Sequence, residues 1–218
     1  MQITTRVLVL ACCITSALLI STPAYPELYI AGQVGGAFPG KLDNTRGTGS
    51  RAGETFSDIQ LTNSLVIGGK IGYFLESYRW LGAEIDAYTT TPNIKAQTFQ
   101  RTAPSSAQVI QPEAELRVTT VALNLVMRYP GEVWQPYIGG GPGFFRTTGK
   151  ADFSDSTTGV GFSFIAGLRV FVIQHFAVFG EYKYFGGTFK FDEAFGPGAG
   201  IETDYKGSHI LGGISYHF

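Results

Sequence analysis

The chain ends with GGISYHF, residues 212–218, in which apolar and polar side chains alternate up to the last residue. Ile214 and Phe218 fall on one face of an extended chain, and Ser215 and His217 fall on the other. Chain ends are usually frayed and polar, whereas such alternation is typical of a half-buried strand. The pattern predicts a terminal strand that stays paired in a sheet up to its final residue.

Seven further segments have strand character, and the connections between the segments alternate in length. The predicted strands are 28–38, 59–75, 80–90, 115–129, 134–147, 159–172, 176–189 and 206–218. The connections run long, short, long, short, long, short and long, so every long loop lies on one side of the sheet. Outer-membrane barrels combine short periplasmic turns with long extracellular loops, and a soluble sandwich does not need this asymmetry. The sequence therefore predicts an all-β fold, a single eight-stranded antiparallel up-and-down transmembrane β-barrel.

The composition fits a membrane barrel and excludes one large class of partner. Charged residues make up 15% of the 218 residues, well below the roughly 25% of an ordinary soluble domain. The chain has 29 glycines and 14% aromatic residues, a combination that also occurs in soluble β-sandwiches. The formal net charge of -1 leaves no excess of basic residues for the surface that nucleic-acid binding requires. No nucleic-acid partner is predicted.

The N-terminus has the layout of a cleavable secretory signal peptide. Arg6 precedes an apolar run over residues 7–20, and residues 22–24, TPA, form a small-x-small cleavage site. The expected organisation is a signal peptide over residues 1–24 and one outer-membrane β-barrel domain over residues 25–218.

Both cysteines, Cys12 and Cys13, lie inside this predicted signal peptide. The exported chain would therefore contain no thiol, which excludes a disulfide, a catalytic cysteine and a cysteine-ligated metal site. After residue 24, no apolar stretch approaches the ~18–20 residues that a membrane helix needs. If the mature protein crosses a membrane, it does so with strands.

Alternation divides the predicted strands into one face with charged or small side chains and another with large apolar ones. In the strand over 80–90, Glu84 and Asp86 share a face that excludes Ile85. In a membrane barrel the apolar face contacts lipid and the charged face lines the lumen. The predicted lumen charges are Glu84, Asp86, Arg128, Arg169, Glu181 and Lys183. Because buried charges must be paired, they predict an interior ion-pair network, and a gated ion path is the alternative.

Aromatic residues lie beside the short turns, where an interfacial girdle of a membrane barrel is expected. These residues are Trp80, Tyr129, Trp134, Tyr137 and Phe176. Alternation alone would also fit a soluble protein whose apolar face is its core. The girdle, the asymmetry of the loops and the signal peptide together favour the membrane.

The C-terminal residues Gly213, Tyr216 and Phe218 fit the pattern Gly-x-x-aromatic-x-aromatic. This pattern resembles the sorting signal by which the assembly machinery of bacterial outer-membrane barrels recognises its substrates. Residues 25–218 resemble the small outer-membrane β-barrel family of OmpA/OmpX-type and opacity-like surface proteins, although the first and second loops are fairly long. The stretches that carry the resemblance are LYIAGQVGGAF, PYIGGGPG, FGEYKYF and GGISYHF. The resemblance implies a location in the outer membrane of a Gram-negative bacterium, in contact with lipid and lipopolysaccharide.

The candidate catalytic groups do not combine into a site. Ser208 and His209 are adjacent in a strand, so their side chains face opposite ways and cannot share a proton directly. Ser215 and His217 do share a face, but it is the predicted lumen face. The acidic residues of the last loop match no cation-binding spacing. No enzymatic activity, cofactor or metal site is predicted.

The expected function is that of a non-enzymatic scaffold. Its four polar loops, near residues 39–58, 91–113, 148–158 and 190–205, would contact host surfaces, other cells or lipopolysaccharide, or support envelope integrity. One alternative is a narrow porin-like channel through the lumen. Another is a soluble, secreted, lipocalin-like binder in which the apolar side chains line the interior.

Overall fold

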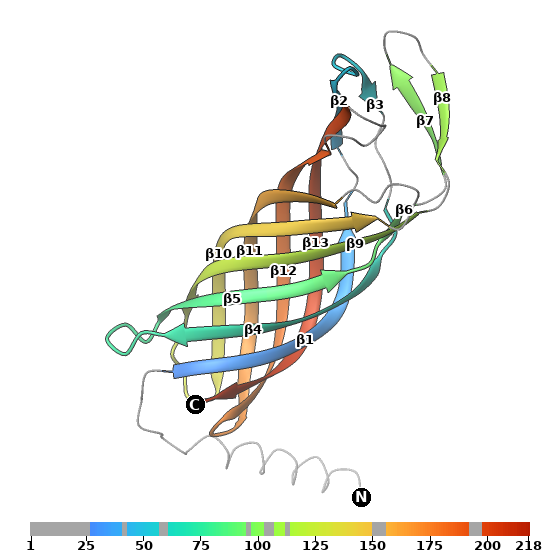
Figure 1. Cartoon of the computed structure of the whole chain (residues 1–218). Helices are drawn as coiled ribbons and strands as arrows, with labels where there is room; N and C mark the ends of the chain where they lie inside the picture. The colour runs from blue at the N-terminus through green and yellow to red at the C-terminus, as the bar shows by residue number, and fades with distance from the viewer. Residues whose placement is uncertain are drawn as a thin grey trace, which may run out of the picture.

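The computed structural model describes residues 27–40, 43–56, 61–94, 97–102, 107–111, 114–149, 156–191 and 198–218. Eight long strands form a closed antiparallel barrel, in which each strand pairs with the next along the chain (Figure 1). They are β1 (Glu27–Pro39), β4 (Ser64–Phe74), β5 (Leu81–Thr90), β9 (Ala114–Arg128), β10 (Trp134–Gly149), β11 (Ser156–Ile173), β12 (Phe176–Phe191) and β13 (Ala199–His217). The predicted up-and-down barrel is confirmed. The predicted signal peptide lies outside the described residues.

The terminal strand closes the barrel. β13 pairs with β1 in an antiparallel register that runs from Tyr29–His217 to Pro39–Gly207. The backbone N–H of Phe218 donates a hydrogen bond of 2.9 Å to the carbonyl oxygen of Leu28. The last residue of the chain is thus held in the sheet, as the alternation of GGISYHF predicts.

The long connections are predicted as loops, but two of them contain strands. β2 (Asp43–Gly49) and β3 (Thr55–Phe56) belong to the first long connection, and β7 (Gln97–Thr102) and β8 (Ala107–Gln111) belong to the second. These four strands form a ribbon that rises beyond the long-loop end of the barrel (Figure 1). A fifth short strand, β6 (Asn93–Ile94), pairs with β9.

The ribbon begins where one edge of β13 would otherwise be unpaired. β13 starts at Ala199, seven residues before the predicted start at residue 206, whereas β1 ends at Pro39. The first part of β13 therefore has no partner on the β1 side, and β2 pairs with it from Ala199–Gly49 to Asp204–Asp43. An open strand edge readily accepts another strand. The fourth predicted loop is correspondingly shorter than expected, and β4 begins at Ser64 instead of residue 59.

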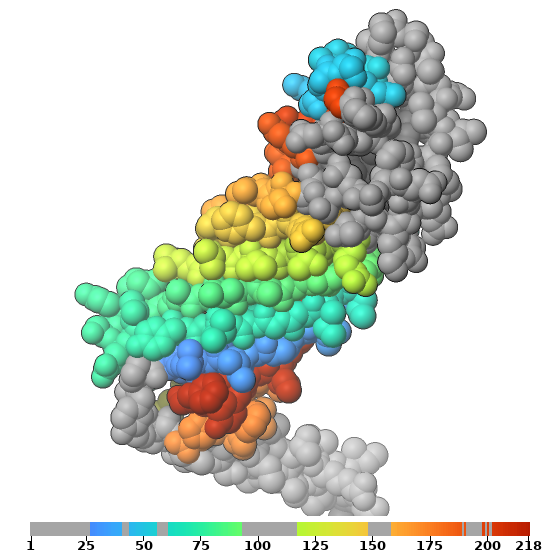
Figure 2. Space-filling model, viewed as in Figure 1, coloured from blue at the N-terminus to red at the C-terminus, as the bar shows by residue number. Residues whose placement is uncertain are grey.

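The two faces of the barrel wall differ sharply. Large apolar side chains point outward along every barrel strand, with Leu65, Ile67 and Ile214 each more than 60% exposed. Figure 2 shows this outer face over β1, β4, β5 and β9. A continuous exposed apolar surface of this kind marks a membrane-facing or binding surface. Within the described part of the chain, no helix is long and apolar enough to cross a membrane.

Candidate functional site

The interior of the barrel is where the structure concentrates its polar side chains. Successive residues of a strand point to opposite faces, so every second residue of each barrel strand points inward. An eight-stranded barrel has an interior just wide enough for side chains to fill. Three layers follow one another from the short-turn end to the long-loop end, and we call them the lower, central and upper layers.

The central layer is an ion-pair network of Lys70, Glu84, Asp86, Glu181 and Lys183. The Nζ atom of Lys70 lies 2.5 Å from Oε2 of Glu181, 3.3 Å from Oε1 of Glu84 and 3.8 Å from Oδ2 of Asp86. Lys183 forms an ion pair with Asp86, and its Nζ lies 3.6 Å from Oε1 of Glu181. All five side chains are buried. The network links β4 and β5 to β12 through the middle of the barrel.

Neutral donors from other strands also hydrogen-bond to these carboxylates. The Tyr29 hydroxyl donates to Oε2 of Glu84 over 2.6 Å, and the Tyr137 hydroxyl donates to Oε2 of Glu181 over 2.8 Å. The Gln33 amide donates to Oδ1 of Asp86 over 2.7 Å. A buried charge is tolerated when it is both paired and hydrogen-bonded. The layer therefore also ties β1 and β10 to the same cluster.

The lower layer surrounds the guanidinium group of Arg128. One terminal nitrogen lies 2.6 Å from Oε2 of Glu27, and the other donates to the amide oxygen of Gln135 over 2.9 Å. The guanidinium also stacks 3.7 Å above the ring centroid of Phe74. His217 contacts the second carboxylate oxygen of Glu27. Glu27, the first described residue of β1, thus joins β9 and β13.

Arg169 lies between the lower and central layers. Its guanidinium is 4.3 Å from the ring centroid of Tyr29 and 5.5 Å from that of Tyr137. Among the described residues, no carboxylate lies within 4 Å of it. The stacking geometry is that of a cation over aromatic faces, an arrangement that favours arginine over lysine. Arg169 extends the charged interior with aromatic partners in place of an acid.

The upper layer is a mainly apolar cluster on the long-loop side of the central layer. Phe145, Phe185 and Tyr205 pack with Leu61 and Val118 in one buried cluster. The rings of Phe145 and Phe185 meet edge to face, with centroids 5.3 Å apart. Between this layer and the central layer, His209 meets the ring of Tyr88 edge-on. The alternation predicts only charged or small side chains on the lumen face, and the rings of Phe145, Phe185 and Tyr205 correct this prediction.

The structure places all six predicted lumen charges inside the barrel and buries each of them. Five contribute to the central or lower layer, and Arg169 bridges the two. Two interior residues are missing from the predicted set. Lys70 is the cation that contacts three carboxylates in the central layer, and Glu27 is the acid that contacts Arg128 and His217 in the lower layer. Alternation alone would have found Lys70, because it shares its strand parity with the buried residues Val66 and Phe74.

One part of the lower layer has the connectivity of a catalytic triad. Ser215 Oγ lies 2.9 Å from Nε2 of His217, and Glu27 contacts the other ring nitrogen. A nucleophilic serine needs access to its substrate, whereas Ser215 is 2% exposed. Tyr29 stacks on the His217 ring with centroids 5.2 Å apart. The arrangement therefore fits a packed hydrogen-bond chain better than an active site.

The other serine and histidine considered for catalysis lie on opposite sides of the wall. Ser208 faces outward and lies 2.8 Å from the Tyr182 hydroxyl, whereas His209 is buried inside. Among the described residues, no group of three or more His, Cys, Asp and Glu side chains could hold a metal ion.

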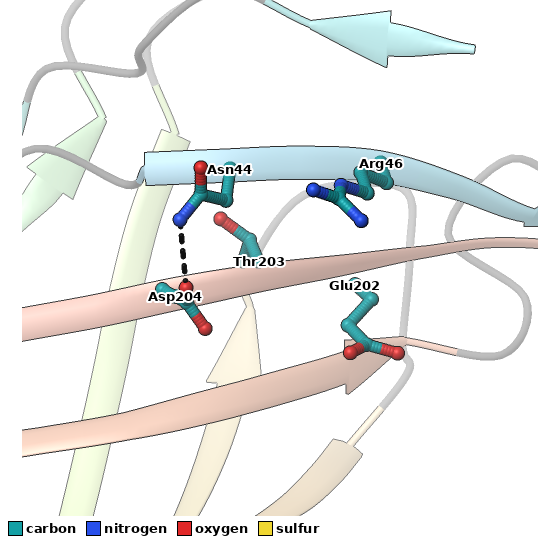
Figure 3. Close-up of a pocket in the computed structure, with 5 residues that line it drawn as sticks. All are labelled: Asn44, Arg46, Glu202, Thr203 and Asp204. Atoms are coloured by element: carbon teal, nitrogen blue, oxygen red, sulfur yellow. Dashed lines mark hydrogen bonds between the residues drawn. The ribbon is translucent and has the colours of Figure 1, made fainter. Parts of the chain in front are cut away.

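A small polar pocket lies outside the barrel, where the ribbon joins β13. Figure 3 shows its lining residues, Asn44 and Arg46 from β2 and Glu202, Thr203 and Asp204 from β13. Its volume of about 170 Å³ is smaller than the roughly 300–1,000 Å³ of typical ligand sites. The pocket is therefore better described as the seam between two strands than as a ligand site.

In addition to the backbone pairing of β2 with β13, the carboxylate of Asp204 accepts side-chain hydrogen bonds at the seam. Asp204 accepts a hydrogen bond of 3.0 Å from the Asn44 amide and one of 2.9 Å from the Thr188 hydroxyl. Both hydrogen bonds lower the pKa of Asp204, and the bond from Asn44 has the larger effect. A carboxyl whose pKa is lower in the folded state stabilises that state above its unfolded pKa. This stabilisation is lost as the pH falls through the lowered value.

The family assignment agrees with the barrel, its charged interior and its apolar exterior. The family described as Outer membrane protein beta-barrel domain matches residues 7–218. The chain belongs to this family. It is therefore an outer-membrane barrel. In barrels of this class the short turns lie in the periplasm and the long loops lie outside the cell. No curated protein sequence matches the chain.

Solved structures of other outer-membrane barrels share the fold. OprG from Pseudomonas aeruginosa superposes with a TM-score of 0.56 at 14% identity, over 88% of this chain and 96% of that one. Neisserial surface protein A has a TM-score of 0.54 at 12% identity, and the match covers 88% of this chain and 97% of that one. The Escherichia coli outer-membrane protease OmpT has a TM-score of 0.46 at 10% identity, over 91% and 99%. OprG and Neisserial surface protein A, with TM-scores above 0.5, show a common fold, and identities this low leave activity open.

The predicted girdle residues of this outer-membrane barrel lie near its periplasmic turns. Four of them point outward and are exposed: Trp80, Tyr129, Trp134 and Phe176. Tyr137 was named with them and does not belong there. It has the parity of the buried residue Gln135, and its hydroxyl bonds Glu181 in the central layer. Its closeness to a turn in the sequence was misleading, and strand parity was the better guide.

The three residues of the predicted assembly signal have different environments. Phe218 is exposed on the outer face, and its ring meets that of Tyr216 edge to face at 4.8 Å. Tyr216 also contacts Phe176 on β12 at 5.0 Å. At Gly213, a β-carbon would lie 2.3 Å from the carbonyl oxygen of Gly32 and 2.4 Å from the ring of Phe179. Packing inside the barrel is thus sufficient to require glycine there.

Proposed function

We propose that the protein is a closed, non-enzymatic outer-membrane scaffold that holds a strand ribbon at the cell surface for contact with other surfaces. The observation that carries this proposal is the filled interior. The central layer crosses the barrel with paired charges, and the upper layer adds a cluster of aromatic and aliphatic side chains above it. Both lie in a barrel whose width leaves room for little else.

The lipocalin-like alternative needs an apolar interior and a polar exterior. The structure has the opposite arrangement, with Lys70, Asp86 and Lys183 buried inside and large apolar side chains exposed outside. The C-terminal residues support delivery to the outer membrane by the barrel assembly machinery, and the ribbon and loops would contact host cells or neighbouring bacteria.

Reconstituted in planar bilayers, the wild-type protein is expected to show no steady conductance. The Arg128→Gln and Glu181→Gln variants, with lumen charges neutralised, are expected to be equally silent, because neither change removes the upper layer. A wild-type conductance that changes in either variant would establish the narrow channel instead. Because a lumen of this size conducts little, traces of larger porins could dominate the current. The control is therefore a bilayer treated with detergent extract of cells that lack the protein.

Display of the ribbon at the cell surface depends on the seam between the ribbon and β13. Asp204→Ala removes the acceptor of the Asn44 and Thr188 hydrogen bonds. Amide hydrogen exchange over residues 43–49 is expected to become several-fold faster, and adhesion of cells displaying the protein is expected to fall with it. Glu76→Ala, which changes an exposed carboxylate at the periplasmic end, should alter neither. Faster exchange with unchanged adhesion would show that the ribbon is not the contact surface.

A further inference from the structure

The strand β8, at the far end of the ribbon, has one open edge. Among the described strands the sheet ends at β8, whose residues Ala107–Gln111 pair with β7 alone. Proteins usually protect such an edge with charged residues or proline, because its unpaired N–H and C=O groups accept another strand. The five residues of β8, AQVIQ, include neither. The edge is therefore suited to pairing with a further strand, as the first part of β13 pairs with β2.

The sequence of β8 suits pairing with a second copy of itself. Antiparallel pairing about its central residue, Val109, uses all five residues and puts Val109 opposite Val109 of the second copy. Within one copy Val109 pairs with Phe99 of β7. The four strands would then share one row, in the order Phe99, Val109, Val109 and Phe99. Cross-strand pairs of β-branched and aromatic residues stabilise a sheet.

The charge pattern permits the same register. Arg101 is the single charged residue of β7 and β8, and it pairs with Ala107. In the antiparallel pair, Ala107 lies opposite Gln111 of the second copy, and Gln111 pairs with Gln97. The two Arg101 residues therefore lie at opposite ends of the four-stranded sheet, so no like charges face each other. Two-fold pairing of identical chains requires a self-complementary edge of this kind.

The direction of β8 decides where the second copy lies. Figure 1 shows β7 leading away from the barrel and β8 leading back toward it. In an antiparallel pair the second β8 runs the opposite way, so the second barrel points toward the first instead of standing beside it. Two membranes that face each other provide this arrangement, whereas two copies in one membrane do not.

We infer that β8 binds β8 of a second copy on a neighbouring cell, as an antiparallel strand pair. The inference rests on the proposed function, and it names the partner of the displayed ribbon as the same protein. One pair of five-residue strands buries little surface and is weak by itself. Many copies on each cell strengthen the contact, because pairing of the first ribbons holds the others close together. The result is adhesion between cells that both display the protein.

The test mixes two cell populations that carry different fluorescent labels and counts mixed clusters by flow cytometry. Wild-type cells are expected to cluster with wild-type cells and not with cells that lack the protein. Val109→Lys and Val109→Glu each put like charges opposite one another, so either variant mixed with itself should give roughly tenfold fewer clusters. Val109→Lys cells mixed with Val109→Glu cells should recover clustering, because opposite charges then meet.

Gln97→Lys is the matched control, because it adds the same charge to β7 and leaves the open edge of β8 unchanged. These cells should cluster as the wild type does, and the heat-dependent gel shift verifies that each variant is folded.

Clustering of Val109→Lys cells at the wild-type level would overturn the inference. A mixture of Val109→Lys and Val109→Glu cells that stays apart would overturn it as well. Wild-type cells that bind cells lacking the protein equally well would also overturn it, although the ribbon would still be a contact surface. Wild-type cells that bind neither each other nor any host surface would contradict the proposed function too.

Discussion

Lys70→Met is expected to lower the free energy of unfolding of the barrel by about 3–5 kcal/mol, the cost of removing one partner from a buried ion pair. Methionine keeps much of the side-chain volume and removes the charge. Glu84, Asp86 and Glu181 would then share Lys183 as their one remaining ammonium in the central layer. Three carboxylates cannot stay ionised and buried around one cation without a large penalty.

The measurement is urea unfolding in lipid vesicles, followed by the fluorescence of Trp80 and Trp134, the two tryptophans of the chain. Lys206→Met is the matched control, because Lys206 is an exposed lysine of β13 outside the central layer. Adding Glu181→Gln to Lys70→Met should recover part of the loss by removing one unpaired acid. A loss below about 1 kcal/mol in Lys70→Met, the range of a surface ion pair, would contradict a central role for this lysine.

Gly213→Ala is expected to destabilise the barrel by about 1–3 kcal/mol, the usual range for overpacking a well-packed site. The new β-carbon would lie 2.3 Å from the carbonyl oxygen of Gly32. That oxygen belongs to the paired strand β1, so it can move only if the closing strand pair moves with it. Folding into detergent micelles without any assembly machinery, read as the heat-dependent gel shift, measures the packing effect alone.

Gly212→Ala is the control for this substitution. A β-carbon at Gly212 would meet only the carbonyl oxygen of Phe179, at 3.9 Å, so folding in micelles should be unchanged. If Gly213→Ala also folds normally in micelles yet fails to reach the outer membrane in cells, the glycine acts only in sorting. The steric explanation for its presence in the C-terminal pattern would then be wrong.

Much of the barrel could be predicted from local pattern, because strand parity and loop length are local properties. The period of two placed Glu84, Asp86, Glu181 and Lys183 on the inner face without any knowledge of their partners. The same rule would have included Lys70 and excluded Tyr137 from the girdle. The error for Tyr137 came from reading its position along the chain before its strand parity.

The ribbon could not be predicted in the same way. The hydroxyl groups of Thr45 and Thr203 lie 2.8 Å apart although 158 residues separate them. Their pairing depends on β13 extending past β1, and no local stretch of sequence reports the relative lengths of two distant strands. Asn44 adds a backbone φ of 53°, which asparagine tolerates better than most residues. Composition does not distinguish the two cases either, because a polar loop and a paired strand rich in Thr and Gly have similar compositions.

The unequal lengths of β1 and β13 impose an order of events on the folding of this protein. β2 follows β1 by only a few residues and is synthesised early, yet its barrel-side partner belongs to the last strand of the chain. The ribbon can therefore take its final form only after the C-terminal strand has reached its place. A chain truncated before β13 would present its first loop without this support. An ordered ribbon at the cell surface therefore indicates that the barrel below it is complete.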